Sequence, residues 1–62
     1  MDREAILGVF ADLAHSQGFY GRLLARLEEA REDDPEAYEA FMTDLEAQNF
    51  GDPVDLILYI EC

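Results

Sequence analysis

Two Asp-Pro pairs, Asp34-Pro35 and Asp52-Pro53, do most to limit the folds open to this chain. Proline has no backbone N–H, so it fits the first turn of a helix but not its interior, and an aspartate before it can cap that turn. The pairs therefore predict that one helix begins near residue 35 and another near residue 53. Asp33 is a second candidate for the cap of the first of these helices.

Two further amphipathic segments precede the first Asp-Pro pair. Apolar residues recur at helical spacing over residues 3–15, where Asp2 is the expected N-cap, and over residues 17–31, where Ser16 is the expected N-cap. We expect the other helices to pack against the one at 17–31. Gly8 weakens the first helix by about 1 kcal/mol relative to alanine, so it implies either a close neighbour or a tolerated weakness.

The apolar pattern is cleanest over residues 35–48, and Asn49 is a suitable left-handed residue after that helix. The segment 54–60 leaves two interpretations open. It could form a short helix that is apolar nearly all round, or a strand that would have to pair with a second molecule. We favour the helix, because Asp52-Pro53 is a helix start and no other segment is typical of a strand.

The predicted fold is all-α: a compact bundle of three amphipathic helices and a short C-terminal helix, forming a single small helical domain over residues 1–62. A chain of this size buries only about 60 % of the surface that its unfolded form exposes, so its stability is marginal. The expected core combines the C-terminal apolar residues with eight others, namely Phe10, Leu13, Phe19, Leu23, Leu27, Tyr38, Phe41 and Leu45.

Cysteine content and hydropathy indicate a cytoplasmic protein. Cys62 is the one cysteine, so no disulfide can form within the chain, which fits a reducing compartment. We expect this thiol to be solvated and inert. The longest near-continuous apolar run, over residues 54–60, is far shorter than the roughly 20 residues of a membrane span, so no membrane association is predicted.

Charge is distributed unevenly along the chain. Residues 1–31 contain five acids and four arginines, whereas residues 32–62 contain ten acids and no basic residue. Because like charges repel, this composition disfavours direct binding to DNA, RNA or anionic lipid. The partners favoured by electrostatics are basic proteins.

No residue pattern points to catalysis, a cofactor or a metal. His15 is the only histidine, and Ser16 follows it directly, so the two side chains do not face each other on a helix. Cys62 has no second ligand or thiol near it in sequence. The acidic cluster lacks the glycine and the alternating acids of a calcium loop. We therefore expect a protein that is not an enzyme and binds no cofactor.

Two features remain that could carry a function. The first is an apolar surplus in the last segment, which indicates a possible interface formed by Val54, Ile57, Leu58 and Ile60. The second is a possible acidic recognition surface on the residues Glu28, Glu32, Asp33, Asp34, Glu36 and Glu39.

These features predict a non-enzymatic protein-interaction module. It would dock on a protein partner or form a homo-oligomer, most simply a dimer, through the C-terminal apolar surface. The alternative is an acidic inhibitor that imitates a nucleic acid and blocks a basic DNA- or RNA-binding protein.

The residues 16–27 and 47–61 resemble stretches of short uncharacterised proteins of gut Firmicutes, often encoded in phage-like or conjugative elements. The two stretches cover somewhat under half of the chain. The resemblance implies an intracellular bacterial origin and a mobile-element context. It implies no activity, ligand or site residue.

Overall fold

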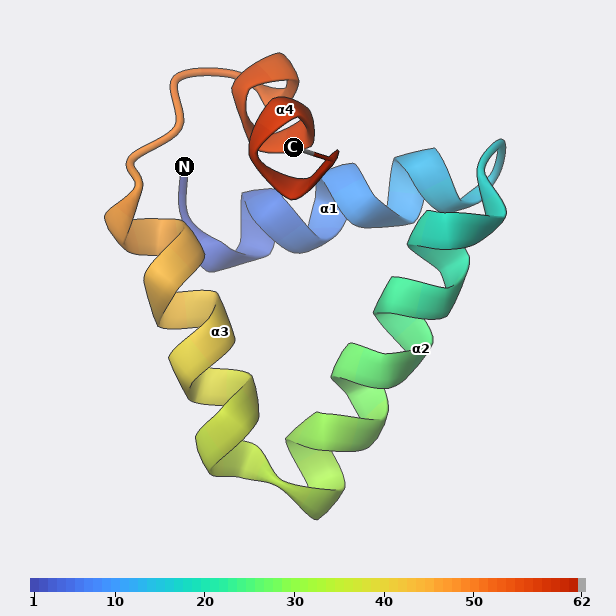
Figure 1. Ribbon diagram of the computed structural model, residues 1–62, viewed down its shortest axis with the longest axis vertical. Helices are drawn as coiled ribbons and strands as arrows, with labels where there is room; N and C mark the ends of the chain where they lie inside the picture. The colour runs from blue at the N-terminus through green and yellow to red at the C-terminus, as the bar shows by residue number, and fades with distance from the viewer. Residues whose placement is uncertain (62) are drawn as a thin grey trace.

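A computed structural model describes residues 1–61 (Figure 1). This part of the chain forms four α-helices and no strand: α1 (Arg3–Ala14), α2 (Gly18–Asp33), α3 (Pro35–Ala47) and α4 (Pro53–Glu61). The predicted all-α fold is confirmed. The last apolar segment is a helix, so the alternative of a strand is wrong. Cys62 lies outside the described residues.

Aspartate caps begin three of the helices, as the sequence predicts. In each case the carboxylate accepts a hydrogen bond from the backbone N–H three residues later, which satisfies a donor that the first turn leaves unpaired. The three bonds join Asp2 to Ala5 at 2.9 Å, Asp34 to Ala37 at 3.3 Å and Asp52 to Asp55 at 3.1 Å.

The start of α2 differs from the prediction. Gln17 occupies the N-cap position and makes no side-chain capping bond. The Ser16 hydroxyl instead donates a hydrogen bond of 3.4 Å to the backbone carbonyl of Leu13, in the last turn of α1. The expectation that Ser16 caps the following helix is therefore wrong, because the turn places it one residue too early.

Helix α1, rather than α2, is the element on which the others pack. It lies against each of the other three helices. In Figure 1, α2 and α3 descend from its two ends and converge at Asp34, while α4 crosses over it on the other side. The expectation that the helices pack around α2 is therefore wrong, since α4 packs on α1.

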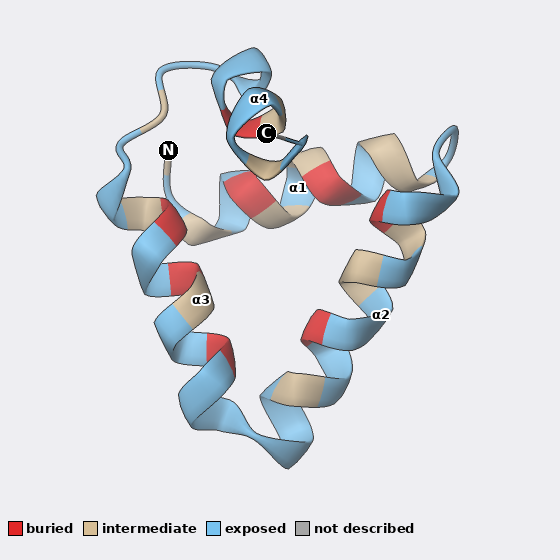
Figure 2. Ribbon diagram, viewed as in Figure 1, coloured by how far each residue is buried: buried red, intermediate tan, exposed pale blue. Residues whose placement is uncertain are grey.

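The core is small, and its buried residues come from all four helices; on α2 and α3 they extend away from α1 toward the turn that joins these two helices (Figure 2). Of the residues expected there, Leu13, Leu23 and Phe41 are only half-buried. Phe19 is 47 % exposed, which corrects its assignment to the core, and its neighbour Tyr20 is fully buried instead. The buried residues are Ile6, Phe10, Tyr20, Leu27, Tyr38, Met42, Leu45 and Leu56.

Arg3 joins the start of α1 to α3. Its guanidinium donates to the carboxylates of Glu39 at 2.6 Å and Glu46 at 3.0 Å, and it lies 5.7 Å from the centre of the Tyr38 ring. This contact is partly exposed, so its contribution to stability is modest. It nevertheless fixes the end of α3 beside α1.

Two backbone features follow from single residues. Asn49 has a φ of 54°, the left-handed conformation expected after α3. At Gly8, a methyl group added to the Cα would meet no heavy atom within 4 Å. Of the two interpretations of Gly8, the structure therefore supports a tolerated weakness.

No helix within residues 1–61 combines the length and the apolar character needed to cross a membrane.

Candidate functional site

Three of the four large hydrophobic residues that are exposed in the described part of the chain lie on α4. Val54 is 60 % exposed and Leu58 is 64 % exposed, and the two residues are one helical turn apart. By helical geometry, the two side chains lie on the side of α4 opposite Leu56, which is fully buried. We refer to Val54 and Leu58 together as the α4 ridge.

The structure divides the four predicted interface residues into two groups. Val54 and Leu58 form the ridge, whereas Ile57 and Ile60 are half-buried at its flanks, and Ile60 packs against the core. Leu56 is fully buried and anchors the helix. Because a nine-residue helix has an inner side, a segment that is apolar all round cannot present every residue outward.

Tyr59 extends the exposed face of α4 and was not among the predicted interface residues. Its side chain is 43 % exposed, and its ring meets that of Phe50 edge-on at 5.4 Å. The Tyr59 hydroxyl donates to the carboxylate of Asp44 at 2.9 Å, and this bond raises the pKa of Tyr59. The aromatic character of position 59 within an exposed helix was the signal available in the sequence.

A second hydrogen bond holds the end of α4. The Tyr20 hydroxyl donates to the carboxylate of Glu61 at 2.7 Å. Burial of the phenol, followed by this bond to a carboxylate, raises the pKa of Tyr20 to about 12. The two tyrosine–carboxylate bonds therefore tie α4 to α2 and to α3.

An apolar groove of about 460 Å³ lies between α2 and α3. Phe19, Leu23 and Leu27 line it from α2, and Tyr38 and Phe41 line it from α3. Sequence analysis did not find it, because each of these residues fits the pattern of an ordinary amphipathic helix.

The local chain geometry explains the groove. Asp34 alone separates α2 from α3, so the two helices are close at the turn and diverge toward α1 (Figure 1). Of its lining residues, Leu27 and Tyr38 are buried, whereas Phe19 is exposed.

Arg22 and Arg26 supply the only charged side chains that line this groove. They are two of the four basic residues in the chain. Within residues 1–61 neither forms an ion pair, whereas Arg3 pairs with two carboxylates. The groove therefore combines an apolar floor with positive charge, in a protein whose formal net charge is −11.

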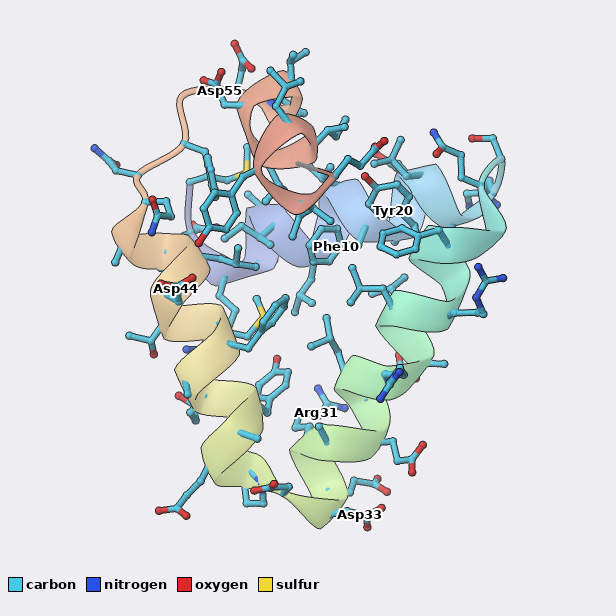
Figure 3. All side chains as sticks on the ribbon, viewed as in Figure 1. Phe10, Tyr20, Arg31, Asp33, Asp44 and Asp55 are labelled. Atoms are coloured by element: carbon cyan, nitrogen blue, oxygen red, sulfur yellow. The ribbon has the colours of Figure 1, made fainter. Side chains whose placement is uncertain are left out.

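The predicted acidic surface surrounds the turn between α2 and α3, at the far end of the molecule from α1. Figure 3 places Asp33 at this tip. All six of these residues are exposed, but two of them have structural partners: the Asp34 carboxylate caps α3, and the Glu39 carboxylate accepts a hydrogen bond from Arg3. The exposed, unpaired members are Glu28, Glu32, Asp33 and Glu36.

No three His, Asp or Glu side chains within 1–61 gather where they could hold a metal ion. His15 and Ser16 are both exposed at the turn after α1, and the Ser16 hydroxyl bonds a backbone carbonyl. Each buried side-chain polar atom in this range has a hydrogen-bond partner.

No protein-family model, curated protein or solved structure matches this chain. The predicted resemblance to proteins of bacterial mobile elements therefore stays a prediction, and function is argued from the surfaces themselves.

Proposed function

We propose that this protein is a non-enzymatic interaction module that self-associates through the exposed apolar face of α4. The observation that carries the proposal is the exposure of Val54 and Leu58, one turn apart on the same side of a short helix. A large aliphatic side chain left in water gives up the roughly 1.5–3 kcal/mol that full burial provides. Covering both residues in a complex recovers part of that free energy.

The small size of the domain supports self-association. Only eight hydrophobic residues in the described range are buried, so the core supplies little stability beyond the entropy of folding. A partner that binds only the folded form adds to stability by mass action. The single cysteine is consistent with a reducing, cytoplasmic setting for this association.

Sedimentation velocity of the parent chain and of Leu58→Asp tests this proposal. Ala11→Asp is the charge-matched control, because Ala11 is exposed and belongs to α1 rather than to α4. We expect self-association in the parent over about 10 µM to 1 mM, the range of a small interface, and its loss in Leu58→Asp alone. A parent that stays monomeric throughout, or equal loss in both variants, would contradict the proposal.

A second candidate function is an acidic decoy for a basic nucleic-acid-binding protein. It is favoured by the position of the carboxylates of Glu28, Glu32, Asp33 and Glu36 around an exposed tip without a paired base. Binding of this kind would weaken steeply between low and high salt, because it depends on charge. A basic partner whose affinity is the same at both salt concentrations would exclude it.

A further inference from the structure

We infer that the groove between α2 and α3 receives the α4 ridge of a second copy of this chain. This inference rests on the proposed self-association and names the surface that receives α4. The contact joins two unlike surfaces, so each copy offers one ridge and one groove.

The exposed apolar residues identify the occupant. Among the described residues, four large hydrophobic side chains are exposed: Phe19, Val54, Leu58 and Tyr59. Phe19 belongs to the groove, and the other three belong to α4. Within residues 1–61, the exposed large hydrophobic side chains therefore lie either at the groove or on α4, and each of these surfaces could cover the other.

The dimensions of the two surfaces agree. The lining residues on α2 run from Phe19 to Ala30, which is about 16 Å along the helix axis at 1.5 Å per residue. Helix α4 has nine residues and is therefore about 13 Å long. An amphipathic helix laid in an apolar groove is a recurring mode of protein recognition.

Charge favours binding of α4 in the groove over packing of α4 against the α4 of the second copy. The turn and helix that carry the ridge contain Asp52, Asp55 and Glu61 and no basic residue. Pairing α4 with α4 would place these acids opposite one another. Pairing α4 with the groove instead brings them toward Arg22 and Arg26, which form no ion pair within residues 1–61.

The position of Asp55 makes this difference measurable. Asp55 follows Val54 directly and is exposed, and Figure 3 shows it on the side of α4 that faces away from α1. If α4 binds the groove, Asp55→Arg sets like charges against Arg22 and Arg26 and weakens self-association. If α4 binds α4, the same substitution relieves repulsion between acids and strengthens it.

Sedimentation equilibrium of three variants and one mixture tests the inference. The variants are Asp55→Arg, the double variant Arg22→Glu/Arg26→Glu, and the control Asp12→Arg, which reverses an exposed acid on α1. Relative to the control, we expect Asp55→Arg and the double variant each to weaken self-association at least tenfold. Mixing the two weakened variants should restore a 1:1 complex, because the reversed groove then accepts the reversed helix.

Circular dichroism first shows that each variant is helical, which is expected because all four substituted residues are exposed. Stronger self-association of Asp55→Arg than of the control would overturn the inference while leaving association through α4 intact. Failure of the mixture to form a complex would also overturn it. A parent that does not associate would refute both the inference and the proposed function.

Discussion

The hydroxyl of Tyr20, at the start of α2, donates a 2.7 Å hydrogen bond to the carboxylate of Glu61, at the end of α4. The two residues are separated by most of the chain, and their contact fixes the end of the helix that carries the ridge. The Tyr20 ring also stacks on Phe10 of α1 at 6.0 Å. One buried side chain therefore connects three helices.

Tyr20→Phe removes this hydrogen bond and keeps the buried ring. We expect a loss of about 1 kcal/mol in the free energy of unfolding, measured by urea denaturation near neutral pH. The exposed Glu61 carboxylate regains water, which limits the cost. Tyr59→Phe is the matched control, and because the Tyr59–Asp44 bond is exposed, it should cost less. A Tyr20→Phe variant as stable as the parent would contradict the role of this bond.

The raised pKa of Tyr20 predicts a loss of stability in alkali. An unfolded tyrosine titrates near about 10, whereas burial and the bond to Glu61 raise the pKa of Tyr20 to about 12. A raised folded-state pKa gives stability that is complete below the unfolded pKa and is lost as the pH rises through the folded value. The stability advantage of the parent over Tyr20→Phe should therefore shrink between pH 10 and pH 12. An advantage that is constant or grows over this range would contradict the assignment.

Three leucines test the position of the core. Leu45 is fully buried, so Leu45→Ala should cost about 2–5 kcal/mol, enough to unfold a marginal domain. Leu23 is half-buried at the groove, so Leu23→Ala should cost about 1 kcal/mol. Leu58→Ala should change stability by less than about 0.5 kcal/mol at concentrations where the chain is monomeric. Thermal unfolding, followed by circular dichroism, ranks the three variants by their loss of stability. A loss for Leu23→Ala equal to that for Leu45→Ala would show that Leu23 belongs to the core.

Gly8→Ala should stabilise the protein by about 1 kcal/mol, because alanine restricts the unfolded chain and the added methyl meets no neighbour. In a domain of this size, that change raises the melting temperature by about 4–8 °C. A lower melting temperature would show that Gly8 allows a close approach after all.

Asp34→Ala and Ser16→Ala compare a real helix cap with a predicted one that proved wrong. Asp34→Ala removes an observed capping bond and should cost about 1 kcal/mol. Ser16→Ala removes only a 3.4 Å bond from an exposed hydroxyl and should have almost no effect. Urea denaturation of the two variants gives the comparison, and equal costs would contradict the described start of α2.

The sequence predicts those features that depend on neighbouring residues. The Asp-Pro pairs locate the starts of α3 and α4 because cap and proline act within one turn. Phe19 and Tyr20 show where this local reasoning ends. Both fit the broad apolar stripe of α2, and only the way α1 crosses that helix decides that Tyr20 is buried and Phe19 exposed.

The candidate site could be predicted only in part for the same reason. The surplus of apolar residues in the last segment predicted an interface of four residues, and two of these, Val54 and Leu58, are exposed. The groove depends on the angle at which α2 and α3 diverge from Asp34, which no local pattern encodes. The contacts of Arg3 with Glu39 and Glu46 join residues far apart in the chain, so no local sequence pattern predicts them either.

Paramagnetic relaxation between two copies of the chain tests the central claim most directly. Cys62 is the only cysteine, so a nitroxide can be attached at that position alone, directly after α4. The labelled chain is mixed with a ¹⁵N-labelled Cys62→Ser copy, in which any broadening must come from the other molecule. We predict broadening of amides in α2 and α3 that border the groove. Broadening confined to α4 would contradict binding in the groove, and no broadening at millimolar concentration would contradict self-association itself.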